Sequence, residues 1–523
     1  MDDIALPEKT TCAPQESGPI PAYHRVENCD VEVPRPAALI IFGASGDLAY
    51  RKLLPSLYRL YKNRMLAEQF FILGTSRVEM TTEQYRASLY DAIKVALPRD
   101  FDQAIWDKFA PRIYYSTFDY GSLESYTREL ADLLPKLESK HQTTGNRIFY
   151  LAIPPTVFED VIHNLGAAGL SREDKGCSHL VIEKPFGYDL ASARKLNRLV
   201  HTHYKESQIF RIDHYLAKET VQNVLMFRFA NSIFEPLWNR RYVDHVQITA
   251  SETLGVEHRA GYYEQAGVMR DMFQNHMFQL LCLTAMEPPP LFIADRVQDE
   301  KAKVLRSLRR FSSGEFNDHI SIGQYTKGTI NGREVPAYGD EPGVDKQSAT
   351  PTFAAMKVFV DNWRWNGVPF YLRSGKRLAS RRTEISIHFK DVPYSMFPDS
   401  VTGPIAPNVI LLKIQPEEGM SLFHQAKQAG TKLCLNTVEM KHDYPRGVAL
   451  DAYEWVLLDC MLGDHMLFMR EDSVELAWSA LTPVLDALES DKVVPLARYA
   501  AGTDGPAGAL DLLRKDGRSW RPL

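Results

Sequence analysis

An unbroken apolar run followed at once by glycines limits the possible folds of this chain more than any other feature. Residues 37–42 read Ala-Ala-Leu-Ile-Ile-Phe, and residues 43–49 continue as Gly-Ala-Ser-Gly-Asp-Leu-Ala before a helical pattern. A short run that is apolar on both faces is typical of a strand buried in a parallel sheet. This stretch therefore predicts a strand, a glycine turn and a helix.

Strand-like runs recur along the chain, but their setting changes near residue 210. The earlier runs lie at 70–74, 112–115, 147–153 and 179–183, with helical segments between them. Strands that alternate with helices indicate a doubly wound parallel sheet of the Rossmann type. The later runs lie at 242–250, 369–373, 383–389 and 409–414. They lack regular crossover helices, which favours a large, mostly antiparallel sheet with helices on one face.

The sequence thus predicts an α/β domain over residues 37–210 and an α+β domain over 211–523, after a flexible, proline-rich extension over 1–36. The net charge of the 523 residues is only −5, and basic residues occur in short clusters. Neither a nucleic acid nor a membrane is therefore an expected partner. The six cysteines form no Cys-x-x-Cys pair, and no signal-peptide pattern opens the chain, which favours a reducing cytoplasm.

The glycine turn has the residue types that a dinucleotide needs. Gly43 and Gly46 allow a pyrophosphate to approach the backbone closely, although their spacing is not Gly-x-Gly-x-x-Gly and a plain tight turn is the alternative. After the second strand, Arg77 stands where an acidic residue would hold a ribose 2′-hydroxyl, so the 2′-phosphate of NADP is favoured. Lys52 is a candidate helper. Glu79 keeps NAD open, and Arg77 could also be an ordinary exposed arginine.

Lys184 directly follows the fifth strand, in the sequence Glu-Lys-Pro-Phe-Gly over residues 183–187. Ligands of doubly wound sheets bind beyond the carboxyl ends of the strands. We therefore expect the Lys184 ammonium to point into the ligand crevice, whereas a lysine at a strand end is more commonly just solvated.

The most chemically dense segment is Arg-Ile-Asp-His-Tyr-Leu-Ala-Lys-Glu over residues 211–219, which precedes a stretch without proline or glycine that runs to residue 229. The pattern predicts a helix over 215–229, with His214 and Lys218 on one face. Hydrogen-bond donors gathered at a helix N-terminus suit a phosphate or carboxylate, and Asp213 suits the orientation of a basic group. The alternative is a solvated helix start with an aspartate cap and an intrahelical Tyr215/Glu219 pair.

A second histidine, His276, lies among apolar residues of a predicted helix over 270–285. A partly buried core histidine is the simplest interpretation. If a carboxylate such as Asp213 oriented it, an imidazole with a pKa near about 6.5 would be a suitable general base. Asp271 lies five positions earlier, about 140° away around an α-helix, so the two side chains are expected to meet different neighbours.

No metal site is expected from the sequence. His201-x-His203 is the one histidine pair with suggestive spacing, and no third ligand is near it along the chain.

Five motifs in one order closely resemble the glucose-6-phosphate dehydrogenase family. They occupy residues 43–49, 183–187, 211–219, 270–276 and 372–376, and the similarity runs from about residue 37 to the end. The resemblance implies hydride transfer from C1 of glucose 6-phosphate to NADP, which gives 6-phosphogluconolactone in the first step of the oxidative pentose phosphate pathway. It also implies a Rossmann domain that binds NADP and an α+β domain that binds the substrate and builds a homodimer or homotetramer.

The resemblance also implies roles for individual residues. His276 matches the base that takes the C1 hydroxyl proton, and Asp213 matches the carboxylate that orients it. The substrate-binding positions are Lys184, His214, Tyr215, Lys218, Glu252, Asp271, Lys376 and Arg381. The cofactor-binding positions are Gly43, Ser45, Gly46, Asp47, Arg77 and Lys184.

The chain departs from the family pattern at Ala217, where glycine is common, and no ligands for a second, structural NADP align convincingly near residues 421–427 or in the C-terminal tail. Two other functions stay open: an oxidoreductase of the glucose-fructose oxidoreductase type that acts on unphosphorylated sugars, and a non-catalytic NADP sensor.

Overall fold

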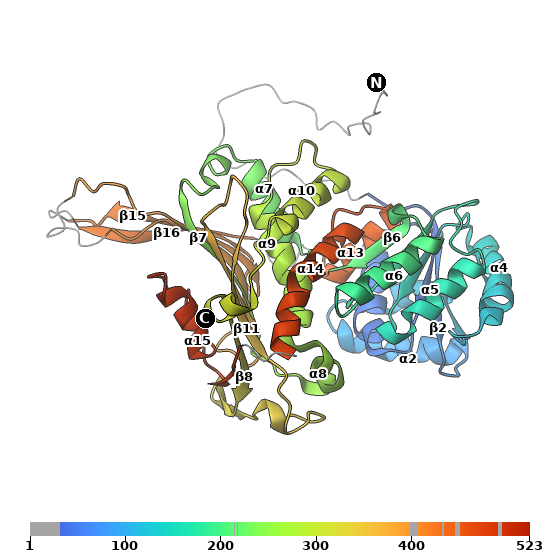
Figure 1. The fold of residues 1–523 in the computed structure, drawn as a ribbon. Coiled ribbons are helices and arrows are strands. Elements are labelled where there is room, and N and C mark those ends of the chain that lie inside the picture. The colour runs from blue at the N-terminus through green and yellow to red at the C-terminus, as the bar shows by residue number, and fades with distance from the viewer. Residues whose placement is uncertain are drawn as a thin grey trace, which may run out of the picture.

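The computed structural model describes residues 32–213, 215–216, 218–397, 405–430, 434–444, 450–489 and 494–523. Within these residues the chain forms two large sheets with a layer of helices between them (Figure 1). The predicted flexible extension over 1–36 lies mostly outside the described part of the chain. No helix among the described residues is both long and apolar enough to span a bilayer.

The first sheet has seven described strands, which in spatial order are β17 (Phe468–Met469), β6 (Ile209–Ile212), β5 (Ser178–Ile182), β4 (Arg147–Leu151), β1 (Ala37–Phe42), β2 (Phe70–Ser76) and β3 (Ile113–Thr117). All pairs are parallel except β17 with β6. Every residue of β1 is buried, as expected for a strand covered on both faces.

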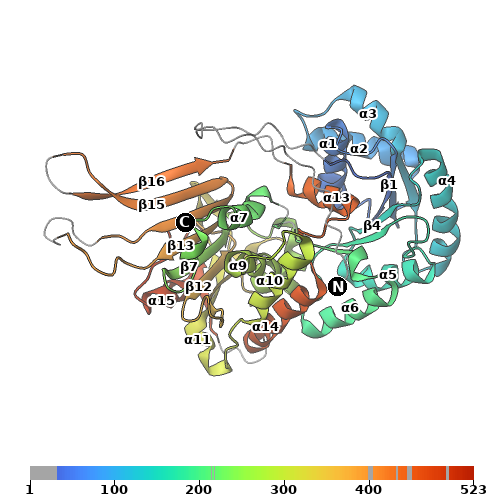
Figure 2. The same ribbon diagram turned by 90° about the horizontal axis from the view of Figure 1, so that it is seen from above.

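Helices cover both faces of the first sheet (Figure 2). They are α1 (Leu54–Lys62), α2 (Thr82–Ala96), α3 (Gln103–Phe109), α4 (Ala131–His141), α5 (Phe158–Ala167), α6 (Leu190–His203) and, from late in the chain, α13 (Ala452–Leu462). Local sequence sets several of their starts. Thr81 and Asp189 each accept a hydrogen bond from a backbone N–H of the first turn, and such a cap stabilises a helix by about 1 kcal/mol.

The second sheet has nine described strands, in the order β16 (Leu435–Asp443), β15 (Gly419–Lys427), β14 (Val409–Gln415), β13 (Arg382–Phe389), β7 (Val243–Ser251), β12 (Pro369–Gly375), β11 (Phe353–Phe359), β8 (Ile320–Thr326) and β18 (Leu496–Ala500). Most pairs are antiparallel, and β12 with β7 and β18 with β8 are parallel. The fold prediction is thus confirmed in both parts, although β8, β11, β15, β16 and β18 were not expected.

Helices lie on the face of the second sheet that looks toward the first sheet, and a short one lies across its other face (Figure 1). The former are α7 (Glu219–Phe229), α9 (Phe278–Ala285), α10 (Ala294–Arg306) and α14 (Glu471–Glu489). The latter is α15 (Ala507–Arg514), which packs with Tyr371, Tyr499 and Trp520 in a separate small core. The end of the chain therefore completes the second sheet, whereas β17 completes the first.

The predicted helix over 215–229 begins later than expected. Asp213 Oδ1 accepts a hydrogen bond of 2.9 Å from the backbone N–H of Tyr215, which closes a turn ahead of the helix. Lys218 is in an extended conformation, with φ −79° and ψ 131°, and α7 starts at Glu219. Lys218 therefore lies ahead of α7, and the alternative of an intrahelical Tyr215/Glu219 pair is wrong for the same reason. The expected shared face of His214 and Lys218 involves a residue outside the described part of the chain. His214 itself and Ala217 lie outside the described residues.

Candidate active site

The loop between β1 and the first helical turn has a backbone that favours glycine. Gly43 has φ +86°, and an added Cβ would lie 2.2 Å from the carbonyl oxygen of Ala152. At Gly46 an added Cβ would lie 3.1 Å from the carbonyl oxygen of Gly43. The hydroxyls of Ser45 and Ser76 are 2.6 Å apart, which ties the loop to the end of β2. Because these residues are glycines, no side chain covers this edge of the sheet, which is where doubly wound sheets bind dinucleotides.

Some charged residues around this loop pair with another side chain, and these are less available to bind a ligand. Arg77 is exposed directly after β2. Asp47 lies 3.4 Å from Arg51 in an exposed pair, and Lys52 lies 3.7 Å from Asp451. Arg77 thus has the position expected of a ligand for a ribose 2′-phosphate, and its role stays a prediction.

Lys184, just beyond β5, lies in a largely buried group of polar side chains. Its Nζ is 2.9 Å from His276 Nε2, 3.4 Å from Asp271 Oδ1 and 3.3 Å from the Asp271 carbonyl oxygen. Only 15% of the Lys184 side chain is exposed. Lys184 is therefore not a merely solvated lysine at a strand end.

Asp271 and His276 belong to η8 (Met269–Met277), a π-helix that continues into α9. The backbone hydrogen bonds of a π-helix join residues five apart, so those residues lie closer to one face than in an α-helix. The expectation that Asp271 and His276 meet different neighbours is wrong, because both contact Lys184. The winding of this segment, which the sequence does not reveal, produces the convergence.

His276 is buried and pairs with Asp213, which directly follows β6. His276 Nδ1 and Asp213 Oδ1 are 2.5 Å apart, and each residue is 1% exposed. The Tyr215 ring stacks on the imidazole at 4.0 Å between centroids. The alternative of a core histidine held only by apolar packing is excluded by these contacts.

The partners of the two ring nitrogens define the state of His276. The Asp213 carboxylate accepts hydrogen bonds, so Nδ1 carries the proton, and the Lys184 ammonium only donates, so Nε2 presents its lone pair. Burial lowers the pKa of His276 below its ordinary value, the Asp213 charge raises it, and the Lys184 charge lowers it further. The imidazole is therefore a neutral base near neutral pH, with Nε2 directed toward Lys184.

Two carboxylates lie near the same site. Burial raises the pKa of Asp271, but the charges of Lys184 and Lys376 outweigh burial and hold that pKa below its usual range. Lys376 Nζ lies 2.6 Å from Glu252 Oε2. Ionised carboxylates and ammonium groups in one pocket suit the hydroxyl groups of a sugar, which both donate and accept hydrogen bonds.

The cationic end of the site centres on Lys218. Its Nζ donates to Gln415 Oε1 and lies 3.8 Å from the centre of the Tyr215 ring. Burial first, and then the charge of the exposed Arg381, lower the pKa of Lys218 to about 8. Tyr215 contacts both His276 and Lys218, so the imidazole and the ammonium lie against the same aromatic ring.

The structure thus brings together most of the expected site residues. The expected residues joined by contacts here are Lys184, Asp213, Tyr215, Lys218, Glu252, Asp271, His276 and Lys376, and the charge of Arg381 acts on Lys218. Gln415 was not expected. It contacts Lys218, Tyr215 and Thr383 from the end of β14, and no local pattern marks it. Tyr262 was also missed, and its hydroxyl lies 3.3 Å from Asp271 Oδ1.

Comparison with known proteins gives one consistent result. A family model described as "Glucose-6-phosphate dehydrogenase, NAD binding domain" matches residues 40–223, and one described as "Glucose-6-phosphate dehydrogenase, C-terminal domain" matches residues 225–521. A glucose-6-phosphate 1-dehydrogenase of Chlamydia pneumoniae is 44% identical over 497 residues, which cover 93% of this chain and 96% of the relative. That of Bacillus subtilis is 42% identical and covers 92% and 98%.

Solved structures show the same similarity. A glucose-6-phosphate dehydrogenase in complex with its substrate glucose 6-phosphate superposes with a TM-score of 0.85 at 34% identity, over 93% of this chain and 99% of the other. A glucose-6-phosphate 1-dehydrogenase from Mycobacterium avium gives a TM-score of 0.80 at 34% identity, over 93% and 98%.

Proposed function

The chain belongs to the glucose-6-phosphate dehydrogenase family, and we propose that His276 is the general base of its reaction and Asp213 the carboxylate that orients this base. The protein is an NADP-dependent oxidoreductase that converts glucose 6-phosphate to 6-phosphogluconolactone. The observation that carries the residue assignment is the buried His276–Asp213 pair, whose second ring nitrogen points toward Lys184.

The base acts on the C1 hydroxyl. His276 Nε2 takes the hydroxyl proton, and Asp213 stabilises the imidazolium that results, since the carboxylate already holds the Nδ1 proton. Lys184 moves from Nε2 to a sugar hydroxyl when the C1 hydroxyl occupies its place. Asp271 and Glu252 accept hydrogen bonds from the remaining hydroxyls and hold C1 in position.

The cofactor fits the glycine loop. A Cβ at Gly43 would clash with the carbonyl oxygen of Ala152, so only glycine lets this loop lie so close to the strand end. Gly43, Ser45, Gly46 and Asp47 are the residues we assign to the pyrophosphate side, with Arg77 at the 2′-phosphate and Lys184 near the nicotinamide. NADP held by these residues would supply the acceptor for the hydride that leaves C1.

The phosphate of the substrate binds at the cationic end. Lys218 and Arg381 supply charge, Tyr215 supplies a hydroxyl, and His214 completes the set that the family resemblance implies. Lys376, which lies 2.6 Å from Glu252, adds a further cation to the pocket. An unphosphorylated sugar would leave the half-buried Lys218 without an anion, which argues against an enzyme of the glucose-fructose oxidoreductase type.

The direct test is an absorbance assay at about 340 nm with a panel of substrates and both cofactors. We expect reduction of NADP with glucose 6-phosphate and at least about 100-fold lower kcat/KM with glucose, because a phosphate contact of about 3 kcal/mol is lost. Equal activity on the two sugars would remove the role of Lys218, and no activity with either would favour a sensor.

We propose in addition that the chain forms a homodimer or homotetramer through its second sheet. The hairpin of β15 and β16 extends away from the body of the molecule (Figure 1), and its edge strand carries Val438 and Met440, which are 38% and 60% exposed. Light scattering during gel filtration should give the mass of two or four chains, and Met440→Asp should weaken the association.

The described cysteines, Cys177, Cys282, Cys434 and Cys460, are free thiols, which supports a cytoplasmic location.

A further inference from the structure

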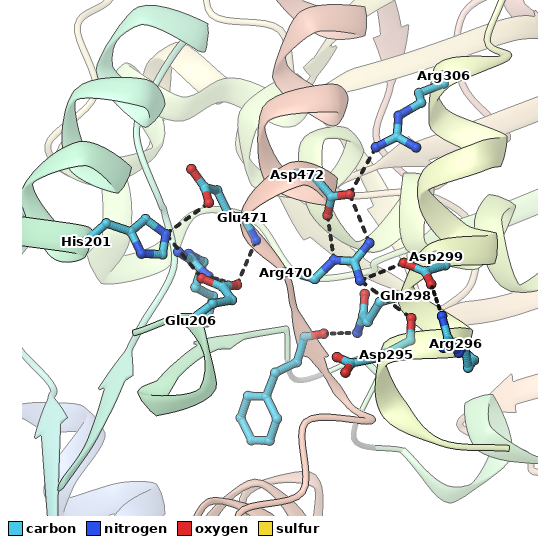
Figure 3. Close-up of polar contacts among 12 residues, drawn as sticks. His201, Glu206, Asp295, Arg296, Gln298, Asp299, Arg306, Arg470, Glu471 and Asp472 are labelled. Atoms are coloured by element: carbon cyan, nitrogen blue, oxygen red, sulfur yellow. Dashed lines mark hydrogen bonds and ion pairs between the residues drawn. The ribbon is translucent and has the colours of Figure 1, made fainter. Parts of the chain in front are cut away.

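A histidine and two glutamates meet where the first sheet domain contacts the C-terminal helices (Figure 3). His201 lies near the end of α6, Glu206 opens the short helix η5 (Glu206–Gln208), and Glu471 is the first residue of α14. His201 Nε2 is 3.3 Å from Glu206 Oε2 and 3.0 Å from Glu471 Oε2. Three side chains from two parts of the chain thus direct one atom each toward a common point.

The hydrogen bonds around these atoms leave that common point unfilled by protein. His201 Nε2 and Glu206 Oε2 are both buried, and neither has a hydrogen bond of good geometry to any described residue, although they lie close to each other. An imidazole N–H directed at one carboxylate would satisfy both atoms. The observed arrangement instead suits a nitrogen lone pair and carboxylate oxygens that face a shared cation.

The opposite side of Glu206 is firmly held. Its Oε1 accepts 2.7 Å and 2.9 Å hydrogen bonds from Arg211 Nη1 and from the backbone N–H of Glu471. These contacts fix the carboxylate so that Oε2 faces His201. Outer contacts of this kind orient the ligands in metal sites, and their loss typically weakens metal binding about 10- to 100-fold.

The distances suit zinc. Zn²⁺ binds imidazole nitrogen and carboxylate oxygen at about 2.0 to 2.2 Å, which places the ligand atoms of a tetrahedral site about 3.3 to 3.6 Å apart. The separation of His201 Nε2 from Glu206 Oε2 is 3.3 Å, within this range, and that from Glu471 Oε2 is 3.0 Å, which is slightly shorter. All three ligand atoms lie within 4.8 Å of one another, so small side-chain shifts would place them around one ion. The three side chains are 27%, 32% and 42% exposed, so an ion can enter from solvent and keep a water molecule as a fourth ligand.

We propose that His201, Glu206 and Glu471 form a site for Zn²⁺ that joins the nucleotide-binding domain to the start of α14. The expectation of no metal site rested on the absence of a third ligand near His201-x-His203 in the sequence. His203 is not part of the site, because its ring packs against His163. The additional ligands come from Glu206 and, much later in the chain, from Glu471. Since α14 also packs against η8, the ion would fix the helix that supports the segment carrying His276.

The test measures zinc binding to the full-length protein after chelator treatment and dialysis. Equilibrium dialysis with metal analysis should find one Zn²⁺ per chain that is lost in His201→Gln and Glu471→Gln, both of which retain every cysteine. Calorimetry should show a melting temperature that rises with ZnCl₂ and not with MgCl₂. In Arg306→Gln, which removes the neighbouring 3.2 Å ion pair with Asp472 outside the site, zinc binding should match that of the unchanged protein.

Three results would overturn the proposal. One is the absence of stoichiometric zinc binding. Another is zinc affinity in both His201→Gln and Glu471→Gln within about threefold of the unchanged protein, since loss of a direct ligand weakens binding at least as much as loss of an outer contact. The third is a melting temperature that does not rise with ZnCl₂, because the three side chains would then need no cation to hold them together.

Discussion

Asp271 and His276 lie five residues apart on a π-helix, and both side chains contact the ammonium of Lys184. In an α-helix they would diverge by about 140°. The π-helical winding therefore decides that the base and a sugar-binding carboxylate face the same pocket.

Replacement of His276 by asparagine should lower kcat by about 10² to 10⁴, because the variant keeps a polar side chain but loses the group that takes the proton. Steady-state assays with glucose 6-phosphate and NADP measure this effect. The KM for NADP should change little. A variant that keeps more than about a tenth of the normal kcat would eliminate His276 as the base.

Asp213→Asn should lower kcat by a similar factor, since the amide can donate to Nδ1 and so favour the wrong tautomer.

The wild-type kcat/KM should fall as the pH drops through a pKa below 6.5, because His276 is then protonated and its pKa is lowered mainly by burial. Asp213 raises that pKa, so the acid limb should move to lower pH in Asp213→Asn. A shift to higher pH would contradict the assignment.

Lys218 should make substrate capture sensitive to alkaline pH. Its pKa is lowered to about 8, so the ammonium is present below that pH and lost above it. The kcat/KM for glucose 6-phosphate should therefore fall above about pH 8, whereas kcat should not, because bound phosphate keeps the lysine charged. In Lys218→Arg, which stays charged, this limb should disappear, and Lys218→Ala should raise KM at every pH. An unchanged alkaline limb in Lys218→Arg would exclude Lys218 as its source.

Arg77→Ala should weaken the use of NADP selectively. Loss of an exposed arginine–phosphate contact is expected to raise the KM for NADP by about 10-fold, with little change in the KM for NAD. Assays with both cofactors measure the ratio. Equal effects on the two cofactors would place Arg77 away from the 2′-phosphate. Arg306→Ala is the matched control, because Arg306 pairs with Asp472 of α14 and should leave the ratio unchanged.

Gly43→Ala should destabilise the protein more than Gly46→Ala. Gly43 has φ +86° and its Cβ would lie 2.2 Å from a backbone oxygen, whereas the nearest atom to a Cβ at Gly46 is 3.1 Å away. The combined strain at Gly43 costs about 2 to 4 kcal/mol. Scanning calorimetry should show the lower melting temperature for Gly43→Ala, and the opposite order would contradict the loop geometry.

Much of the architecture follows from local pattern. The buried run at 37–42, the glycine turn and the alternating strands and helices predict the first sheet, because apolar periodicity and turn residues act over short ranges. The later strands are harder to predict. β16 is exposed along almost its whole length and most of β15 is only half-buried, so burial imposes little apolar pattern on their sequence.

The sequence by itself determined which chemical groups the site contains, since Asp213, Lys184 and His276 each stand beside a recognisable strand or helix signal. Only the tertiary structure decided how they meet. A turn closed by Asp213 shifts Lys218 out of the helix, the π-helix rotates Asp271 toward His276, and Gln415 and Glu471 arrive from segments far along the chain. Such contacts depend on backbone winding and chain crossing, which the pattern of neighbouring residues does not encode.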